Sequence, residues 1–106
     1  MNAEFSDLLG AGRWSQAETL WKRYGYQLDA LDDSGGELYE RWADALADTD
    51  PARAIGLYLR SLTQRRLFAS WASSGSEGIA RSMAADHVQG KYEALQRRQS
   101  AENRGA

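Results

Sequence analysis

The sequence predicts an all-α fold of about five helices. Along most of the 106 residues, apolar side chains recur at the spacing of three and four that marks a buried helix face. Ser or Asp stands before several of these runs, where a helix cap is expected. The chain has one Pro and no Val- or Ile-rich alternation, which argues against a β-sheet. Its length suits a single domain.

The first two helices are expected at the N-terminus. One covers roughly residues 3–9 and stops at Gly10-Ala11-Gly12. The next runs from about Trp14 to Tyr24. Ser15 and Glu18 give it a capping-box pattern, in which each side chain bonds the other residue's free backbone N–H.

A loop is expected over residues 29–36, because Asp, Ser and Gly disfavour a helix interior. Ser34 and Glu37 form a second capping-box pattern at its end. We therefore expect a third helix from there to about Asp48.

Asp50-Pro51 predicts the start of the fourth helix, with Asp as N-cap and Pro at the first helical position, and this helix extends to about Trp71. A third capping-box pattern, Ser74 with Glu77, opens the last helix, which ends near Arg98. Six residues are expected to be buried in it: Ile79, Met83, Ala84, Val88, Tyr92 and Leu95. Residues 1–98 then form the domain, and residues 99–106 form a frayed, disordered tail.

The fourth helix is apolar on two sides. One side carries Ile55, Tyr58, Leu59 and Leu62, and nearly opposite lie Leu57, Phe68 and Trp71, together with Arg60. Such a helix is either packed between two neighbours or offers one side to another molecule.

One segment resembles the turn and second helix of a tetratricopeptide repeat. A turn Gly, an aromatic residue, a small residue and a second aromatic stand at the family's spacing in Gly12, Trp14, Ala17 and Trp21. A second copy places Ala54 and Tyr58 at the last two positions, 37 residues later, where the family usually has 34. Thr49 or Asp50 stands where the second turn Gly would be, and the Pro that usually ends the repeat is absent.

The resemblance implies a scaffold that binds a peptide or a protein on the first helix of each hairpin, with the last helix as a cap. In this chain the complete first helix of a hairpin is the one that ends near Asp48. It carries an acidic stripe, which could receive a basic segment: Glu37, Glu40, Asp44 and Asp48. An ordinary solvated face, or pairing with the chain's own Arg97, Arg98 or Arg104, would explain the stripe equally well.

Charge is divided unevenly along the chain. Residues 1–50 hold four Lys/Arg against eleven Asp/Glu, a net −7, whereas residues 51–106 hold nine against four, a net +5. The two halves could dock on each other within one chain or between two copies, so a homodimer is one outcome.

No constellation of catalytic residues emerges, so we expect a protein without enzymatic activity. There is no Cys, His87 is the one His, and we expect neither a cofactor nor a metal. The acidic residues from Asp29 to Glu37 lack EF-hand spacing, and residues 73–78 lack the Lys of a phosphate-binding loop.

We therefore expect a cytoplasmic protein that binds another protein or a peptide, as an adaptor, a chaperone or an inhibitor. No apolar run is long enough for a membrane span, and no signal peptide is recognisable. Nucleic acid is an unlikely partner because the acidic half would repel it, and self-association is the main alternative. The residues predicted to bind the partner are Glu37, Glu40, Asp44, Asp48, Arg60, Phe68 and Trp71, whereas Trp14, Trp21, Trp42 and Tyr58 are assigned to the core.

Overall fold

The computed structural model describes residues 3–28, 33–72 and 75–105. Over these residues it contains five α-helices and no strand, which confirms the all-α prediction. The helices are α1 (Ala3–Gly10), α2 (Trp14–Leu28), α3 (Ser34–Leu46), α4 (Pro51–Ser70) and α5 (Gly75–Gly105). Within α2 the backbone at Tyr24 is not helical, with φ −124° and ψ 15°.

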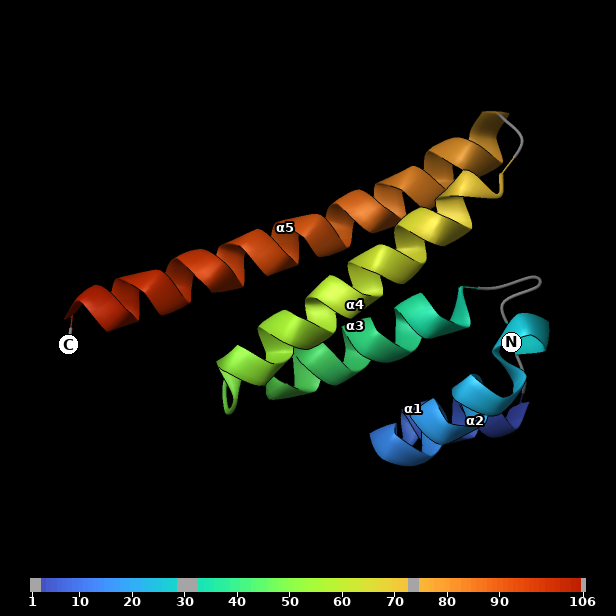
Figure 1. The fold of residues 1–106 in the computed structure, drawn as a ribbon, viewed down its shortest axis with the longest axis horizontal. Helices are drawn as coiled ribbons and strands as arrows, with labels where there is room; N and C mark the ends of the chain where they lie inside the picture. Colours follow the sequence, from blue (N-terminus) through green and yellow to red (C-terminus); the bar gives the residue numbers. More distant parts are fainter. Residues whose placement is uncertain (1–2, 29–32, 73–74, 106) are drawn as a thin grey trace.

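The helices pack in chain order, and α4 lies between α3 and α5 (Figure 1). This arrangement explains why α4 is apolar on two sides. α1 packs on α2, and α2 packs on α3. The molecule measures 46 × 32 × 18 Å. α5 alone, at about 1.5 Å per residue, accounts for the longest dimension.

Every helix contributes to one apolar core. The fully buried large residues are Phe5 and Leu9 from α1, Leu38 from α3 and Val88 from α5. Trp42 and Tyr58 are buried as expected, and Trp14 and Trp21 pack against the core with part of each ring exposed. The core also contains three fully buried alanines, Ala17, Ala43 and Ala54, which allow neighbouring helices to approach closely.

The start of α3 differs from the prediction. Asp33, not Ser34, is its N-cap, because the Gly36 N–H donates to Asp33 Oδ1 at 3.0 Å. The Ser34 hydroxyl donates instead to the Leu28 carbonyl oxygen at 3.0 Å. Residues 34–36 therefore belong to the helix and not to a loop, while residues 29–32 lie outside the described part of the chain.

Gly35 and Gly36 stand in the first turn of α3 because two large side chains pass over it. A Cβ on Gly35 would lie 2.6 Å from Trp21 Cζ2. A Cβ on Gly36 would lie 2.6 Å from Arg65 Cγ and 2.5 Å from Asp33 Oδ2. Side chains from α2 and α4 thus approach the α3 backbone at a distance that only glycine permits.

The start of α4 agrees with the prediction. Asp50 is the N-cap and its Oδ1 accepts the Arg53 N–H at 3.3 Å, with Pro51 following it in the first turn. The predicted cap at Ser74 lies outside the described residues.

Two residues predicted to be buried in α5 are exposed. Ile79 lies nine residues, or about half a rotation, before Val88, which is buried, so Ile79 points away from the core. Met83 lies on that outer side as well, and both side chains are exposed. Leu59, expected on a buried face of α4, is also exposed, since the adjacent Tyr58 takes the buried direction.

α5 also continues past Arg98, through the segment expected to be a frayed tail, as far as Gly105. Nothing in residues 99–104 breaks a helix, and Arg98 Nε lies 3.7 Å from Glu102 Oε1, one turn later.

Candidate functional site

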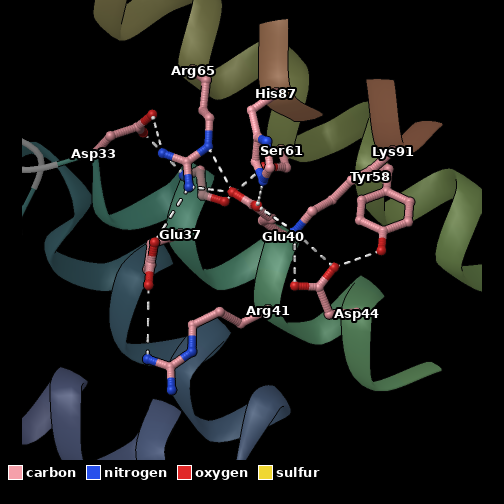
Figure 2. A network of polar contacts seen from close by, with 11 residues as sticks. Asp33, Glu37, Glu40, Arg41, Asp44, Tyr58, Ser61, Arg65, His87 and Lys91 are labelled. Carbon is pink, nitrogen blue, oxygen red and sulfur yellow. Dashed lines mark hydrogen bonds and ion pairs between the residues drawn. The ribbon is translucent and has the colours of Figure 1, made fainter. Parts of the chain in front are cut away.

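The acidic stripe of α3 faces cations of α4 and α5 in a network that we call the ionic face (Figure 2). Its members are Asp33, Glu37, Glu40, Asp44, Arg65 and Lys91. These residues belong to α3 and its N-cap, to α4 and to α5, so the network spans the centre of the molecule.

Arg65 of α4 is the hub of the ionic face. Its guanidinium reaches Glu40 Oε1 at 3.1 Å through Nε, Asp33 Oδ2 at 3.4 Å and Glu37 Oε2 at 3.3 Å. The side chains of Arg65 and Glu40 are only 11% and 12% exposed. A planar guanidinium with several donors suits such a multiple contact better than an ammonium.

Lys91 of α5 completes the network from the other side. Its Nζ lies 2.7 Å from Glu40 Oε2 and 3.1 Å from Asp44 Oδ2. Glu40 therefore bridges α4 and α5, with one oxygen toward each helix.

The network shifts the pKa of Glu40 and of Lys91. Burial acts to raise the pKa of Glu40, but hydrogen bonds from Lys91 and Arg65 outweigh it and lower the pKa below 4.5. Burial acts to lower the pKa of Lys91, but the hydrogen bonds to Glu40 and Asp44 raise it above 10.5. Glu40, Arg65 and Lys91 are therefore all charged at neutral pH.

Two tyrosines add hydrogen bonds to carboxylates. The Tyr58 hydroxyl donates to Asp44 Oδ1 at 2.6 Å, and the Tyr39 hydroxyl donates to Glu18 Oε2 at 2.7 Å. Burial and the bond to Glu18 raise the pKa of Tyr39 to about 12. Among the described residues no buried polar side-chain atom lacks a hydrogen-bond partner.

All four residues of the predicted acidic stripe thus contact cations of the same chain. Glu37, Glu40 and Asp44 belong to the ionic face, and Asp48 Oδ1 lies 3.3 Å from Arg98 Nη1. Sequence reasoning named Arg98 as one alternative but missed Arg65 and Lys91. The excess of Lys and Arg in residues 51–106 indicated that such cations exist. It did not indicate which of them face the stripe, because that depends on the register between helices.

The other three predicted residues occupy two separate places. Arg60 lies beside α2, with its guanidinium 3.7 Å from Glu18 Oε2 and 5.8 Å from the Tyr39 ring centroid. Phe68 and Trp71 meet edge to face, 6.2 Å between centroids, at the C-terminal end of α4. Arg60 is about 16 Å along the helix from Trp71.

Phe68 is held from the α5 side. The Arg81 guanidinium lies 3.8 Å from the Phe68 ring centroid, and Arg81 Nη1 donates to the Phe68 carbonyl oxygen at 2.9 Å. This contact ties α4 to α5 beside their connection and fixes the position from which Trp71 projects.

The end of the α4–α5 hairpin is apolar on both sides. Its exposed residues are Leu67 (45%), Trp71 (57%), Ile79 (63%) and Met83 (64%), and together we call them the apolar tip. Each helix contributes a pair one turn apart. Single exposed apolar residues are normal on a protein surface, and apolar residues gathered at one place are a feature of interaction sites.

Within the described residues no group of three His, Cys, Asp or Glu side chains could hold a metal ion. His87 is exposed, with Nε2 3.9 Å from Glu40 Oε2, and no nucleophile is paired with it. Among the described helices none is long and apolar enough to cross a membrane.

Comparison of the chain with protein-family models, with curated proteins and with solved structures finds no match in any of the three.

Proposed function

We propose that the protein is a non-enzymatic interaction module that binds another protein through the apolar tip. The observation that carries this proposal is the exposure of Leu67, Trp71, Ile79 and Met83 at one end of the hairpin. Covering large apolar side chains is the main source of affinity in protein interfaces, and Trp is enriched among the residues that dominate it.

The anchoring of the tip supports the same proposal. Arg81 and the Phe68 ring hold the base of Trp71, so the side chain is presented from an ordered surface. A preorganised anchor loses less conformational entropy when it binds. The resemblance of the sequence to tetratricopeptide repeats likewise implies a scaffold that binds a protein or a peptide.

The acidic stripe has a smaller part in this proposal than the sequence suggested. Its carboxylates already have cationic partners within the chain. A basic peptide would have to displace Arg65 or Lys91, which would leave a partly buried charge unpaired. We therefore assign the stripe to holding the helices together.

Photo-crosslinking tests the proposal. A photoreactive phenylalanine analogue at Ile79 should give one reproducible crosslinked product in an extract of the source cells, and the same analogue at Ser100 should not. The product should disappear in Trp71→Ser with Met83→Ser, and the purified product should bind the wild-type protein directly. The matched control is Leu59→Ser, which alters an exposed leucine outside the tip.

Equal crosslinking at Ile79 and Ser100, or a product that survives the tip substitutions, would contradict the proposal. Far-UV circular dichroism of each variant separates loss of binding from loss of fold. Since all altered side chains are exposed, the fold should remain intact.

Self-association through the same tip is the second candidate function, and the same four exposed side chains favour it. Light scattering after size exclusion at low and high salt separates the two. A dimer that persists at high salt and becomes a monomer in Trp71→Ser with Met83→Ser indicates self-association, whereas a monomer at both salt concentrations leaves the tip free for another protein.

A further inference from the structure

A second surface, remote from the apolar tip, has a different chemistry. Trp14, Trp42 and Leu46 line a groove of about 460 Å³ between the start of α2, the end of α3 and the start of α4. Gly12, at φ 69°, turns the chain beside it. We call it the tryptophan groove. Its volume falls in the range of about 300–1,000 Å³ typical of ligand pockets.

The groove carries two cations and no carboxylate. Arg13 and Arg53 line it, no Asp or Glu is among its lining residues, and the Arg53 guanidinium lies 5.1 Å from the Trp42 ring centroid. Both arginines are exposed. Neither forms an ion pair with any carboxylate in the described part of the chain.

Five of the chain's eleven arginines are paired with a carboxylate within the chain. A carboxylate of the same chain lies within 4 Å of Arg41, Arg60, Arg65, Arg81 and Arg98. Arg13 and Arg53, like Arg23, Arg66, Arg97 and Arg104, form no ion pair with a carboxylate of the described residues. At the tryptophan groove two positive charges lie beside the partly exposed Trp14 ring and the Trp42 ring, which is 6% exposed.

We propose that the tryptophan groove binds a short acidic peptide segment with a large apolar residue at its centre. The apolar side chain would pack against the exposed parts of Trp14 and Leu46, and carboxylates on either side of it would pair with Arg13 and Arg53. Arginine can hold a carboxylate through two parallel hydrogen bonds, which gives direction as well as charge attraction.

A peptide fits the charge distribution better than a nucleic acid does. Asp48 and Asp50 lie beyond the end of α3, close in sequence to the groove residues Leu46 and Arg53. A phosphate backbone that continued past the groove would meet these carboxylates. A segment with two or three carboxylates around one apolar anchor is shorter than such a backbone and brings fewer negative charges near them.

The groove is independent of the proposed function. Arg53 and Trp71 lie at opposite ends of α4, about 27 Å apart along the helix, so substitutions in one surface leave the other unchanged. Failure of the tip experiments and failure of the groove experiments are therefore separate results.

Fluorescence anisotropy with labelled probes tests the inference. The first probe is an acidic peptide with a central Leu-Phe. The others are its charge-reversed version with Lys throughout, its version with Gly-Ser in place of Leu-Phe, and oligothymidylate of similar length. The acidic Leu-Phe peptide should bind at least tenfold more tightly than each of the other three.

Charge reversal then locates the site. Arg13→Glu with Arg53→Glu should weaken binding of the acidic Leu-Phe peptide at least tenfold. The control, Arg23→Glu with Arg97→Glu, makes the same change in net charge at exposed arginines outside the groove and should change the affinity less than twofold. Trp14→Leu should weaken binding with no change in charge.

Three results would overturn the inference. They are tighter binding of oligothymidylate than of the acidic Leu-Phe peptide, equal loss in the groove and control variants, and binding that survives substitution of both Arg13 and Arg53. Thermal unfolding of each variant checks that the fold is kept. Glu is favourable in the first turn of a helix, where Arg53 lies, so the groove variant should fold.

Discussion

Glycine at position 36 is the residue on which the ionic face depends most directly. The Arg65 chain passes over it, and the Asp33 carboxylate that caps α3 lies close to the same position. Any larger residue has to move one of these two groups, and Arg65 is already held by three carboxylates.

We expect Gly36→Ala to destabilise the protein by about 1–3 kcal/mol, because the added methyl group overlaps Arg65 and Asp33. Gly56→Ala is the matched control. It adds the same methyl group inside α4, where no atom lies within 4 Å, and should stabilise the protein by about 0.5–1 kcal/mol. Urea unfolding measures both. Destabilisation by both substitutions, or by neither, would contradict the close approach at Gly36.

Helix caps show what single residues can and cannot predict. Asp50-Pro51 favours one local structure, a helix start, and α4 begins there. The Ser34 hydroxyl has two possible roles, since it can cap its own helix or bond to another element. It donates to Leu28 of α2, and the neighbouring Asp33 takes the cap. That choice depends on how α2 lies against α3, which the local sequence does not contain.

At the scale of the helix, α3 is the element that holds the others. Its buried side carries Leu38 and Trp42, and Glu40 on another side bonds both α4 and α5. The four-residue spacing of Glu40, Asp44 and Asp48 predicted an acidic stripe correctly. It did not reveal the partner of each carboxylate, which depends on the register between α3 and helices far along the chain.

The lowered pKa of Glu40 makes stability depend on acid pH. Its carboxylate is more acidic in the folded chain than its usual 4.5, so its stabilising effect is present above about pH 4.5 and is lost as the pH falls below it. We expect Glu40→Gln to lose about 2–4 kcal/mol at pH 7, because Arg65 loses its closest partner. The variant should also lose less stability than the wild type between pH 5 and the acid transition.

Urea unfolding at several pH values measures this effect, and Glu93→Gln, at an exposed position of α5, is its control. The control should change the free energy of unfolding by less than about 0.5 kcal/mol at every pH. If wild type and Glu40→Gln had parallel pH profiles, Glu40 would not be the group that titrates.

Periodicity predicted the helices better than it predicted their buried sides. Val88 and Leu95 are buried in α5 as expected, but Ile79 and Met83 are not. Apolar residues occur on both sides of this helix, and the side that turns inward is set by the position of α4. The same ambiguity hid the tryptophan groove, because Trp14 packs against the core and is also partly exposed.

At the scale of the whole molecule, the uneven charge of the sequence is used within one chain. The acidic first half supplies α3, and the basic second half supplies Arg65, Lys91 and Arg98, which face it. Docking of the two halves within one chain was one of the outcomes the sequence left open. The segregated charges therefore position α4 and α5 on α3.

We expect salt to weaken this arrangement moderately. Raising NaCl from about 0.02 M to about 0.5 M should lower the free energy of unfolding by about 1 kcal/mol, because dissolved ions screen the attraction between the acidic stripe and the cations of α4 and α5. Lys91→Gln should reduce the salt effect, whereas Lys22→Gln, which removes an exposed pair with Glu18, should leave most of it. Stability that rises with NaCl in the wild type would contradict a net attraction between the halves.

The length of α5 has a consequence for anything that assembles on this protein. One uninterrupted helix runs from the apolar tip to the far end of the molecule (Figure 1). At 1.5 Å per residue, Ile79 and Arg104 are about 38 Å apart. A straight helix has no joint at which this distance could change. Two molecules bound at its two ends would therefore be kept at a set separation.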